Sequence, residues 1–309
     1  MIRTEKIVKR FGTLRALSGL SLHVEQGAIY GFLGPNGAGK TTTLRILSGL
    51  ARADQGQAWI MGQRVGLRTL GQRPMLGVLP EEPAFYPWMT AREYLRDFIA
   101  PLYRLRGAEA ARRAAELLET VGLSEAADRR LGGFSRGMRQ RIGLAQALIH
   151  RPQILLLDEP VSALDPAGRK EVLDLIESLR GQTTVMLSTH ILADVERVCD
   201  MIGIIRKGRM VIEARREDLL QRYALPIFEV EADDSLGEWP ERVRQMPFVE
   251  SLSITGRMAR VFVKDMQVAK RELLASLAGQ GLLIRRFEMV MPTLEDVFLR
   301  LTDETSAEN

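Results

Sequence analysis

The sequence of 309 residues has a single cysteine and lacks any apolar run long enough to cross a membrane. Its longest apolar stretches, 154–157 and the interrupted stretch 201–205, fall far short of the roughly 20 residues that a transmembrane helix needs. Cys199 has no second cysteine for an internal disulfide, and the first residues lack the charged and then apolar layout of a secretory signal. We therefore expect a protein of the reducing cytoplasm that reaches a membrane only through a partner.

Internal repeats and low-complexity tracts are also absent, and the composition excludes a disordered or fibrous chain. Hydrophobic residues make up 46% and charged residues 27% of the sequence, close to the averages of soluble globular proteins. The net charge of +4 is uneven, since 33 basic and 24 acidic residues precede Pro226, whereas 10 basic and 15 acidic residues follow from there. A basic front portion suits a surface that meets anions, and a solvated basic surface explains the asymmetry equally well.

The length predicts two domains, of which the first is an α/β domain. Residues 1–224 contain short aliphatic runs that alternate with helical patterns. Examples are the run 28–33 followed by the helical pattern 40–47, and the run 154–157 followed by 167–179. This alternation is typical of parallel α/β units.

A helical insertion and a smaller second domain complete the predicted organisation. Between about residues 90 and 148, Ala, Arg, Leu and Glu at helical spacing indicate helices inserted into the α/β domain. Residues 225–309 read as an α+β domain with the order β-α-β-β-α-β, which a ferredoxin-like domain would produce, and a terminal helix over 293–301. The elements of this order are predicted over 227–231, 236–246, 249–254, 259–263, 268–277 and 282–287.

A glycine-rich loop between a predicted strand and a predicted helix matches the pattern G-x-x-x-x-G-K-[ST]. Glycines let successive backbone N–H groups turn inward and cradle phosphate oxygens at the positive end of the following helix. Lys40 adds a charge for the β- and γ-phosphates, and the Thr41 hydroxyl is placed to bind Mg²⁺. The sequence therefore predicts nucleoside triphosphate binding. The expected phosphate-binding residues are Gly34, Pro35, Asn36, Gly37, Ala38, Gly39, Lys40, Thr41 and Thr42.

A second predicted site lies at the end of the apolar run 154–157, where two carboxylates follow directly. In a parallel sheet the carboxyl ends of the strands face the ligand crevice. Asp158 would then hold Mg²⁺, directly or through water, and Glu159 would accept a proton from the water that attacks the γ-phosphate. An ordinary acidic cap at a strand end is the alternative.

The segment between these two sites carries a resemblance to a known family. Residues 134–141 read Phe-Ser-Arg-Gly-Met-Arg-Gln-Arg and open a long helical run. The order of phosphate loop, helical insertion, Ser-x-Gly segment and Asp-Glu strand resembles the ATP-binding cassette (ABC) superfamily of P-loop NTPases over about residues 1–220. Phe134, Arg136 and Met138 depart from the usual signature Leu-Ser-Gly-Gly-Gln. The form found here resembles a branch of separately encoded ATPase subunits of drug, sodium, antibiotic and polysaccharide exporters.

The residues of this segment suit an anion site at a helix start, because Ser135 is a good N-cap and Gly137 lets backbone donors approach closely. The resemblance implies that the anion is the γ-phosphate bound to another protomer. ATP would lie between two cassettes arranged head to tail as a homodimer or pseudo-dimer. The family's crossing loop corresponds to Asp165, which alternatively only caps the helix that begins near Pro166.

The resemblance implies roles for three further residues. Phe11 takes the place of the aromatic that stacks on adenine, with a core phenylalanine as the alternative. His190 takes the place of the switch histidine that contacts the γ-phosphate and joins Glu159 as an expected catalytic residue. Glu81 stands where the family most often has a glutamine that reaches toward Mg²⁺ and water; its carboxylate would bind Mg²⁺ more strongly or pair with an arginine.

An aromatic segment at 83–89 is read as either the core of the insertion or an exposed docking surface. The residues alone favour the core, whereas the resemblance implies docking of a cytoplasmic helix from a membrane subunit. The segment 291–298 resembles the ending of exporter ATPases that carry an extra C-terminal domain.

The expected function is an ATP-binding and ATP-hydrolysing subunit that powers export through a separate transmembrane permease at the cytoplasmic face of the membrane. ATP and Mg²⁺ are the expected cofactors. An ATPase for maturation of a copper enzyme is the closer alternative. A soluble ABC ATPase that acts on nucleic acid or the ribosome is disfavoured, because the chain has one phosphate loop, one cysteine and no long heptad tract.

Overall fold

The computed structural model describes the chain except for residues 67–74, 224–225, 279–280, 291–292, 295 and 297–309. The chain divides into two compact units, Met1–Arg216 and Glu217–Asn309, and each unit is considered by itself. Within the described ranges, no helix has the length and apolar character needed to cross a bilayer.

The first unit contains an antiparallel sheet that the sequence analysis did not predict. Its strand order is β2-β1-β4-β5. The strands are β1 (Ile2–Phe11), β2 (Leu14–Val24), β4 (Gln55–Ile60) and β5 (Gln63–Arg64). Register shifts interrupt the pairing of β1 with β2 between Thr4 and Ile7 and at two later points. These irregularities break the strict alternation of apolar and polar residues by which a half-buried strand is recognised.

The second sheet of this unit carries the predicted parallel α/β units, in the order β10-β9-β3-β8-β7-β6. All neighbouring pairs are parallel except β9 with β10. The strands are β3 (Ile29–Leu33), β6 (Leu76–Leu79), β7 (Ile154–Asp158), β8 (Thr184–Thr189), β9 (Met201–Arg206) and β10 (Arg209–Arg215). Every residue of β3, β7 and β8 is buried, as expected for strands covered on both faces.

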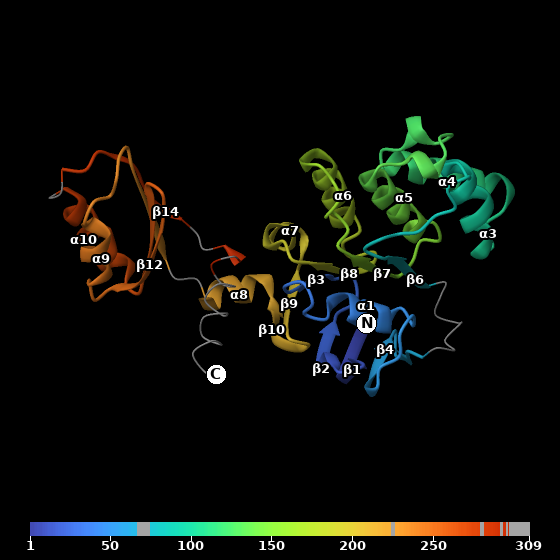
Figure 1. Ribbon diagram of the computed structural model, residues 1–309, viewed down its shortest axis with the longest axis horizontal. Helices are drawn as coiled ribbons and strands as arrows, with labels where there is room; N and C mark the ends of the chain where they lie inside the picture. Colours follow the sequence, from blue (N-terminus) through green and yellow to red (C-terminus); the bar gives the residue numbers. More distant parts are fainter. Residues whose placement is uncertain (67–74, 224–225, 279–280, 291–292, 295, 297–309) are drawn as a thin grey trace. The chain divides into compact units, whose positions relative to one another are not determined.

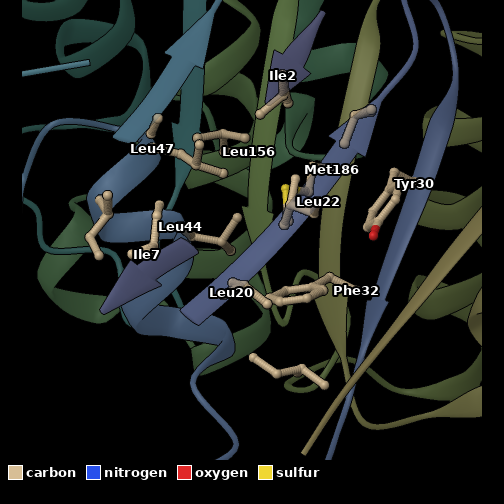
Figure 2. Packing of buried hydrophobic residues seen from close by; sticks show 14 of the residues in the cluster. Ile2, Ile7, Leu20, Leu22, Tyr30, Phe32, Leu44, Leu47, Leu156 and Met186 are labelled. Carbon is tan, nitrogen blue, oxygen red and sulfur yellow. The ribbon is translucent and has the colours of Figure 1, made fainter. Parts of the chain in front are cut away.

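Helix α1 (Lys40–Leu47) lies between the two sheets, whereas α6 (Pro166–Ser178) and α7 (Leu192–Val198) lie on the other side of the parallel sheet (Figure 1). The core between the sheets is shown in Figure 2, where Phe32 and Met186 of the parallel sheet lie beside Leu20 and Leu22 of the antiparallel sheet. Leu44 of α1 belongs to the same cluster. This packing holds the start of α1 next to the carboxyl end of β3 in the parallel sheet.

The single cysteine lies directly after α7, where it packs against β3. Cys199 is buried, and burial raises the pKa of its thiol well above the ordinary value. A Cβ added to Gly31 of β3 would lie 2.5 Å from Val195 Cγ1 and 2.9 Å from Cys199 Sγ. Glycine at this position therefore lets α7 approach the sheet.

The predicted helical insertion is present and begins at Thr90, whose hydroxyl and the Glu93 carboxylate form a reciprocal capping box. Its helices are α2 (Ala91–Glu93), the π-helix η2 (Tyr94–Ile99), α3 (Ala100–Leu102), α4 (Gly107–Thr120) and α5 (Arg136–Leu148). Two short 3₁₀ turns, η3 (Ser124–Ala126) and η4 (Leu131–Gly133), join α4 to α5.

The second unit has the predicted β-α-β-β-α-β order after a first helix, α8 (Arg216–Tyr223). Its antiparallel sheet has the order β12-β13-β11-β14, which is the ferredoxin-like arrangement. Trp239 and Phe228 are the largest side chains of its core. Most of the terminal helix predicted over 293–301 falls outside the described residues. The elements are β11 (Ile227–Ala232), α9 (Trp239–Arg244), β12 (Val249–Thr255), β13 (Met258–Val263), α10 (Met266–Ala278) and β14 (Ile284–Val290).

Candidate active site

The glycine-rich loop joins β3 to α1 and is pressed against neighbouring strands. A Cβ on Gly34 would lie 2.4 Å from the Ile205 carbonyl oxygen, and one on Gly39 would lie 2.8 Å from the Ala16 carbonyl oxygen. Gly39 also has a φ of 113°, in the left-handed region that other residues rarely adopt. A larger residue would therefore clash at either position, and at Gly39 the backbone conformation requires glycine as well.

The first turn of α1 is arranged to receive an anion. Gly39, which caps the helix, has no side chain to occupy the first N–H groups, and the first turn contains no acidic residue. The Lys40 ammonium is buried and donates hydrogen bonds to the carbonyl oxygens of Gly34 at 2.7 Å and Pro35 at 3.4 Å. These bonds hold the lysine over the loop, with Thr41 half-buried beside it.

The two carboxylates at the end of β7 are both buried. Asp158 accepts a hydrogen bond from the Ser188 hydroxyl at 2.5 Å. Glu159 has a φ of 50°, and its N–H donates to the Ser188 carbonyl oxygen at 3.0 Å. A left-handed glutamate is uncommon, and such conformations concentrate at functional sites.

Two positively charged or chargeable groups flank the Glu159 carboxylate. The Lys40 ammonium lies 3.5 Å from Oε1, and His190 Nδ1 lies 3.1 Å from both carboxylate oxygens. His190 directly follows β8, which pairs with both β3 and β7. The parallel sheet thus brings together residues that are far apart in the sequence. The His190 side chain is 47% exposed, whereas the Glu159 side chain is 8% exposed.

Glu81 and Phe11, two further predicted site residues, make no contact with this cluster that is described above. Glu81 follows β6, the neighbour of β7, and is exposed at the same carboxyl edge of the sheet. Phe11 at the end of β1 is 51% exposed, so it is not a core residue. The Lys9 ammonium lies 5.2 Å from the centre of its ring.

Ser135, Gly137 and Asp165 form a second group of their own. The Ser135 hydroxyl caps α5 by accepting from the Met138 N–H at 3.2 Å, and Asp165 caps α6 by accepting from the Gly168 N–H at 3.1 Å. A Cβ on Gly137 would lie 3.2 Å from the Ala163 carbonyl oxygen, so the two loops touch. All three residues line a groove of about 860 Å³.

Two residues that the sequence analysis missed hold the catalytic cluster in place. Ser188 binds both carboxylate-bearing residues, as described above, and the Gln140 side chain donates to the Glu159 carbonyl oxygen at 3.2 Å. Ser188 lies two residues before His190, and Gln140 lies on the helix that Ser135 caps. Their positions next to recognised motifs could have indicated a role at the site. Their bonding partners could not be predicted, because these partners are distant in the sequence.

A phosphate-binding loop, an Asp-Glu pair at the end of another strand of the same parallel sheet and a helical insertion define an ATP-binding cassette ATPase. The family described as "ABC transporter" matches residues 17–162, and the family described as "ATP-binding protein DrrA1-3-like, C-terminal domain" matches residues 215–302. These matches cover parts of both compact units.

Full-length relatives agree with these matches. The ABC transporter ATP-binding protein YxlF of Bacillus subtilis is 40% identical over 97% of this chain and 99% of its own. Daunorubicin resistance ATP-binding protein DrrA2 of Streptomyces coeruleorubidus is 36% identical over 97% and 94% of the two chains. A solved dimer of the cassette MJ0796 bound to ADP and Pi is 26% identical, with a TM-score of 0.64 over 70% of this chain and 98% of that one.

The chain belongs to the ABC transporter family, in which it is an ATP-binding and ATP-hydrolysing protein. The fold class and the family predicted from the sequence are thereby confirmed.

Proposed function

We propose that this ATPase powers export through a separate transmembrane permease, to which it is bound at the cytoplasmic face of the membrane. The observation that carries the catalytic part is the contact of Glu159 with both Lys40 and His190 at the phosphate loop. Export is supported by the relatives, since two that match nearly the whole chain are named as daunorubicin and linearmycin resistance ATP-binding proteins. These names favour export over maturation of a copper enzyme.

The chemistry follows from the positions of the side chains. The backbone of the glycine-rich loop and the Lys40 ammonium would hold the phosphates of ATP. The Glu159 carboxylate would accept a proton from the attacking water, while His190 would hold this carboxylate in place and contact the γ-phosphate.

The donors at this site fit Mg²⁺ bound together with a nucleotide. Nowhere in the described ranges do three His, Cys, Asp or Glu side chains gather as a metal site. Mg²⁺ typically takes only one or two protein oxygens, with phosphates and waters completing its shell. The Thr41 hydroxyl and the Asp158 carboxylate are such oxygens, and Glu81 would add a contact to the ion or its water. When bound, the ion neutralises charge on the phosphates.

The groove of Ser135, Gly137 and Asp165 supports a dimer as the active form. Its residues contribute helix N-terminal donors but neither the lysine nor the base of the catalytic cluster. We infer that Ser135 and Gly137 bind the γ-phosphate held by a second cassette, that Asp165 reaches the same junction, and that Phe11 stacks on adenine. The dimeric state of the similar cassette MJ0796 supports this arrangement.

The permease would dock on an aromatic cluster formed by the segment before the helical insertion and by its helix η2. Trp88 is 65% and Tyr86 41% exposed, and their ring centres lie 5.1 Å apart. Tyr86 also makes an edge contact with Phe98, at 4.9 Å between the ring centres. Exposed aromatic rings held by one another form a rigid apolar surface suited to a partner helix.

Glu159→Gln tests the proposed chemistry. The amide keeps the shape of the side chain but cannot accept the proton, so hydrolysis should fall by about 10² or more while ATP affinity is kept. The purified variant should accumulate as an ATP-bound dimer, measured by turnover, nucleotide binding and light scattering. Glu177→Gln on the exposed face of α6 is the matched control. Equal turnover of Glu159→Gln and the parent would disprove the assignment.

Replacement of Tyr86 and Trp88 by Ser tests the docking surface. Co-purification with the permease should be lost, with basal ATPase activity near that of the parent, because neither ring contacts the catalytic cluster. Leu50→Ser, at a position 71% exposed, controls for loss of an apolar surface residue. A marked decrease of the melting temperature in the double variant would instead identify the rings as structural.

A further inference from the structure

An ion pair with a buried carboxylate joins the two helices that follow the catalytic loops. Arg169 Nε donates to Asp194 Oδ1 at 2.7 Å. Arg169 lies in the first turn of α6, four residues after Asp165, and its N–H donates to the Asp165 carbonyl oxygen at 2.8 Å. Asp194 lies in the first turn of α7, four residues after His190. Each partner is therefore one helical turn from a loop that the proposed mechanism uses.

The Asp194 carboxylate is poorly suited to be only a stabilising group. Its side chain is 2% exposed, and Oδ2 finds no hydrogen-bond partner among the described residues. The pKa of Asp194 is raised above its ordinary value, mainly because the carboxyl group is buried. The Arg169 guanidinium opposes this shift, and the charge of Glu159 adds to it. An ion pair with a buried carboxylate contributes little net stability compared with apolar side chains of the same volume, because the carboxylate loses its hydration. What such a pair does provide is a defined geometry.

The pair also closes a ring of contacts around the catalytic base. From Glu159 the chain runs through 160–164 to Asp165 and into α6, and the ion pair then leads to α7. The chain leads back from α7 to His190, whose Nδ1 contacts Glu159. The ion pair thus links the loop before α6 to α7 and to the histidine that precedes α7.

We propose that Arg169 and Asp194 are positioning residues that couple the loop of Asp165 to His190. A second cassette that engages Asp165 thereby sets the histidine against the Glu159 carboxylate, so hydrolysis depends on the partner. This coupling rests on the roles proposed above for Glu159, His190 and Asp165. It needs no contact of either positioning residue with the nucleotide.

Asp194→Asn tests the coupling in the full chain. The shape is kept and the charge that orients Arg169 is lost, so we expect kcat to fall about tenfold, in line with the cost of slightly misplaced catalytic groups. The KM for ATP and nucleotide binding should change less than about twofold, because the phosphate loop is unaffected. Arg169→Lys, which keeps the positive charge, should retain more of kcat than Arg169→Gln.

The same two helices supply a matched control. Arg197 of α7 pairs with Asp174 of α6, but the Asp174 side chain is 51% exposed, against 2% for Asp194, and the pair lies farther along both helices. Asp174→Asn should leave kcat unchanged. The coupling is overturned if kcat of Asp194→Asn stays within about twofold of the parent, or if Asp174→Asn lowers kcat equally. Should Asp194→Asn fail to fold, Arg169→Gln decides by the same criteria, since the Arg169 side chain is 32% exposed.

Failure of the coupling can be separated from failure of the proposed function. If Glu159→Gln abolishes hydrolysis while Asp194→Asn does not, the base is assigned correctly and the coupling is wrong. A purely structural role for the pair would lower the melting temperature of Asp194→Asn without lowering kcat per folded molecule, which also overturns the proposal.

Discussion

The starts of α1 and α5 are two helix N-termini of one chain, each suited to an anion, but they are built differently. The first follows a left-handed glycine and lies beside a buried lysine and two buried carboxylates. The second follows Ser135, which is exposed and caps its own helix. Neither helix has an acidic residue in its first turn, which leaves the positive end of each dipole uncompensated. Under the function proposed above, the first site would hold the phosphates of ATP with residues of its own chain, whereas the second would bind a nucleotide held by another chain.

Of the changes that test this comparison, Lys40→Ala should have the largest effect, because it removes the buried lysine ammonium that lies at the first site. Nucleotide affinity of the monomer should fall by about 10² or more, as expected for loss of a charge-assisted contact to phosphate. Binding of a fluorescent ATP analogue measures this loss. Lys170→Ala, on the exposed surface of α6, should bind as the parent does. Unchanged affinity of Lys40→Ala would remove the distinction between the two sites.

Gly137→Glu should affect the second site alone. A carboxylate at the start of α5 opposes an incoming phosphate, so ATP-driven dimerisation and turnover should fall about tenfold, while the monomer still binds nucleotide. Light scattering and steady-state turnover measure the two effects. The control is Gly133→Glu, since a Cβ at Gly133 has 3.6 Å to its nearest neighbour, Arg129. Weakened nucleotide binding by the Gly137→Glu monomer would contradict the division between the sites.

A change at His150, just after the C-terminal end of α5, should have the smallest effect, and it should affect stability alone. The His150 ring stacks on Tyr103 at 3.8 Å between centres, and burial lowers the pKa of His150 to about 4. The folded state therefore binds this proton more weakly than the unfolded chain, so the contribution to stability is complete above pH ~6.5 and is lost as the pH falls toward about 4.

His150→Phe keeps a ring for the stack and should reduce the loss of melting temperature between pH 7 and pH 4.5 by a few degrees, of the order that about 1 kcal/mol produces. His23→Gln, at an exposed position, should leave that loss unchanged. Calorimetry at the two pH values measures both. An identical acid sensitivity of His150→Phe and the parent would show that this histidine is not responsible.

The sequence predicts those features that depend on neighbouring residues. The glycine-rich loop, the apolar strand before Asp158 and the caps of α5 and α6 are each encoded within a few residues, and the structure has all of them. The antiparallel sheet was missed because the bulges of β1 interrupt its alternation. The bond of Gln140 to Glu159 and the pair of Arg169 with Asp194 join residues 19 and 25 positions apart. Such contacts depend on the packing of whole helices, which local patterns do not specify.

The burial of Cys199 makes the protein a ready background for site-directed spin labelling. With its thiol inaccessible and protonated, the native cysteine would react slowly, so a cysteine introduced at the surface becomes the main reactive group. Ser124→Cys would place one label at the rim of the groove beside Ser135. In a homodimer the two labels form a single pair, and their separation gives a spectroscopic ruler for cassette closure during the ATPase cycle.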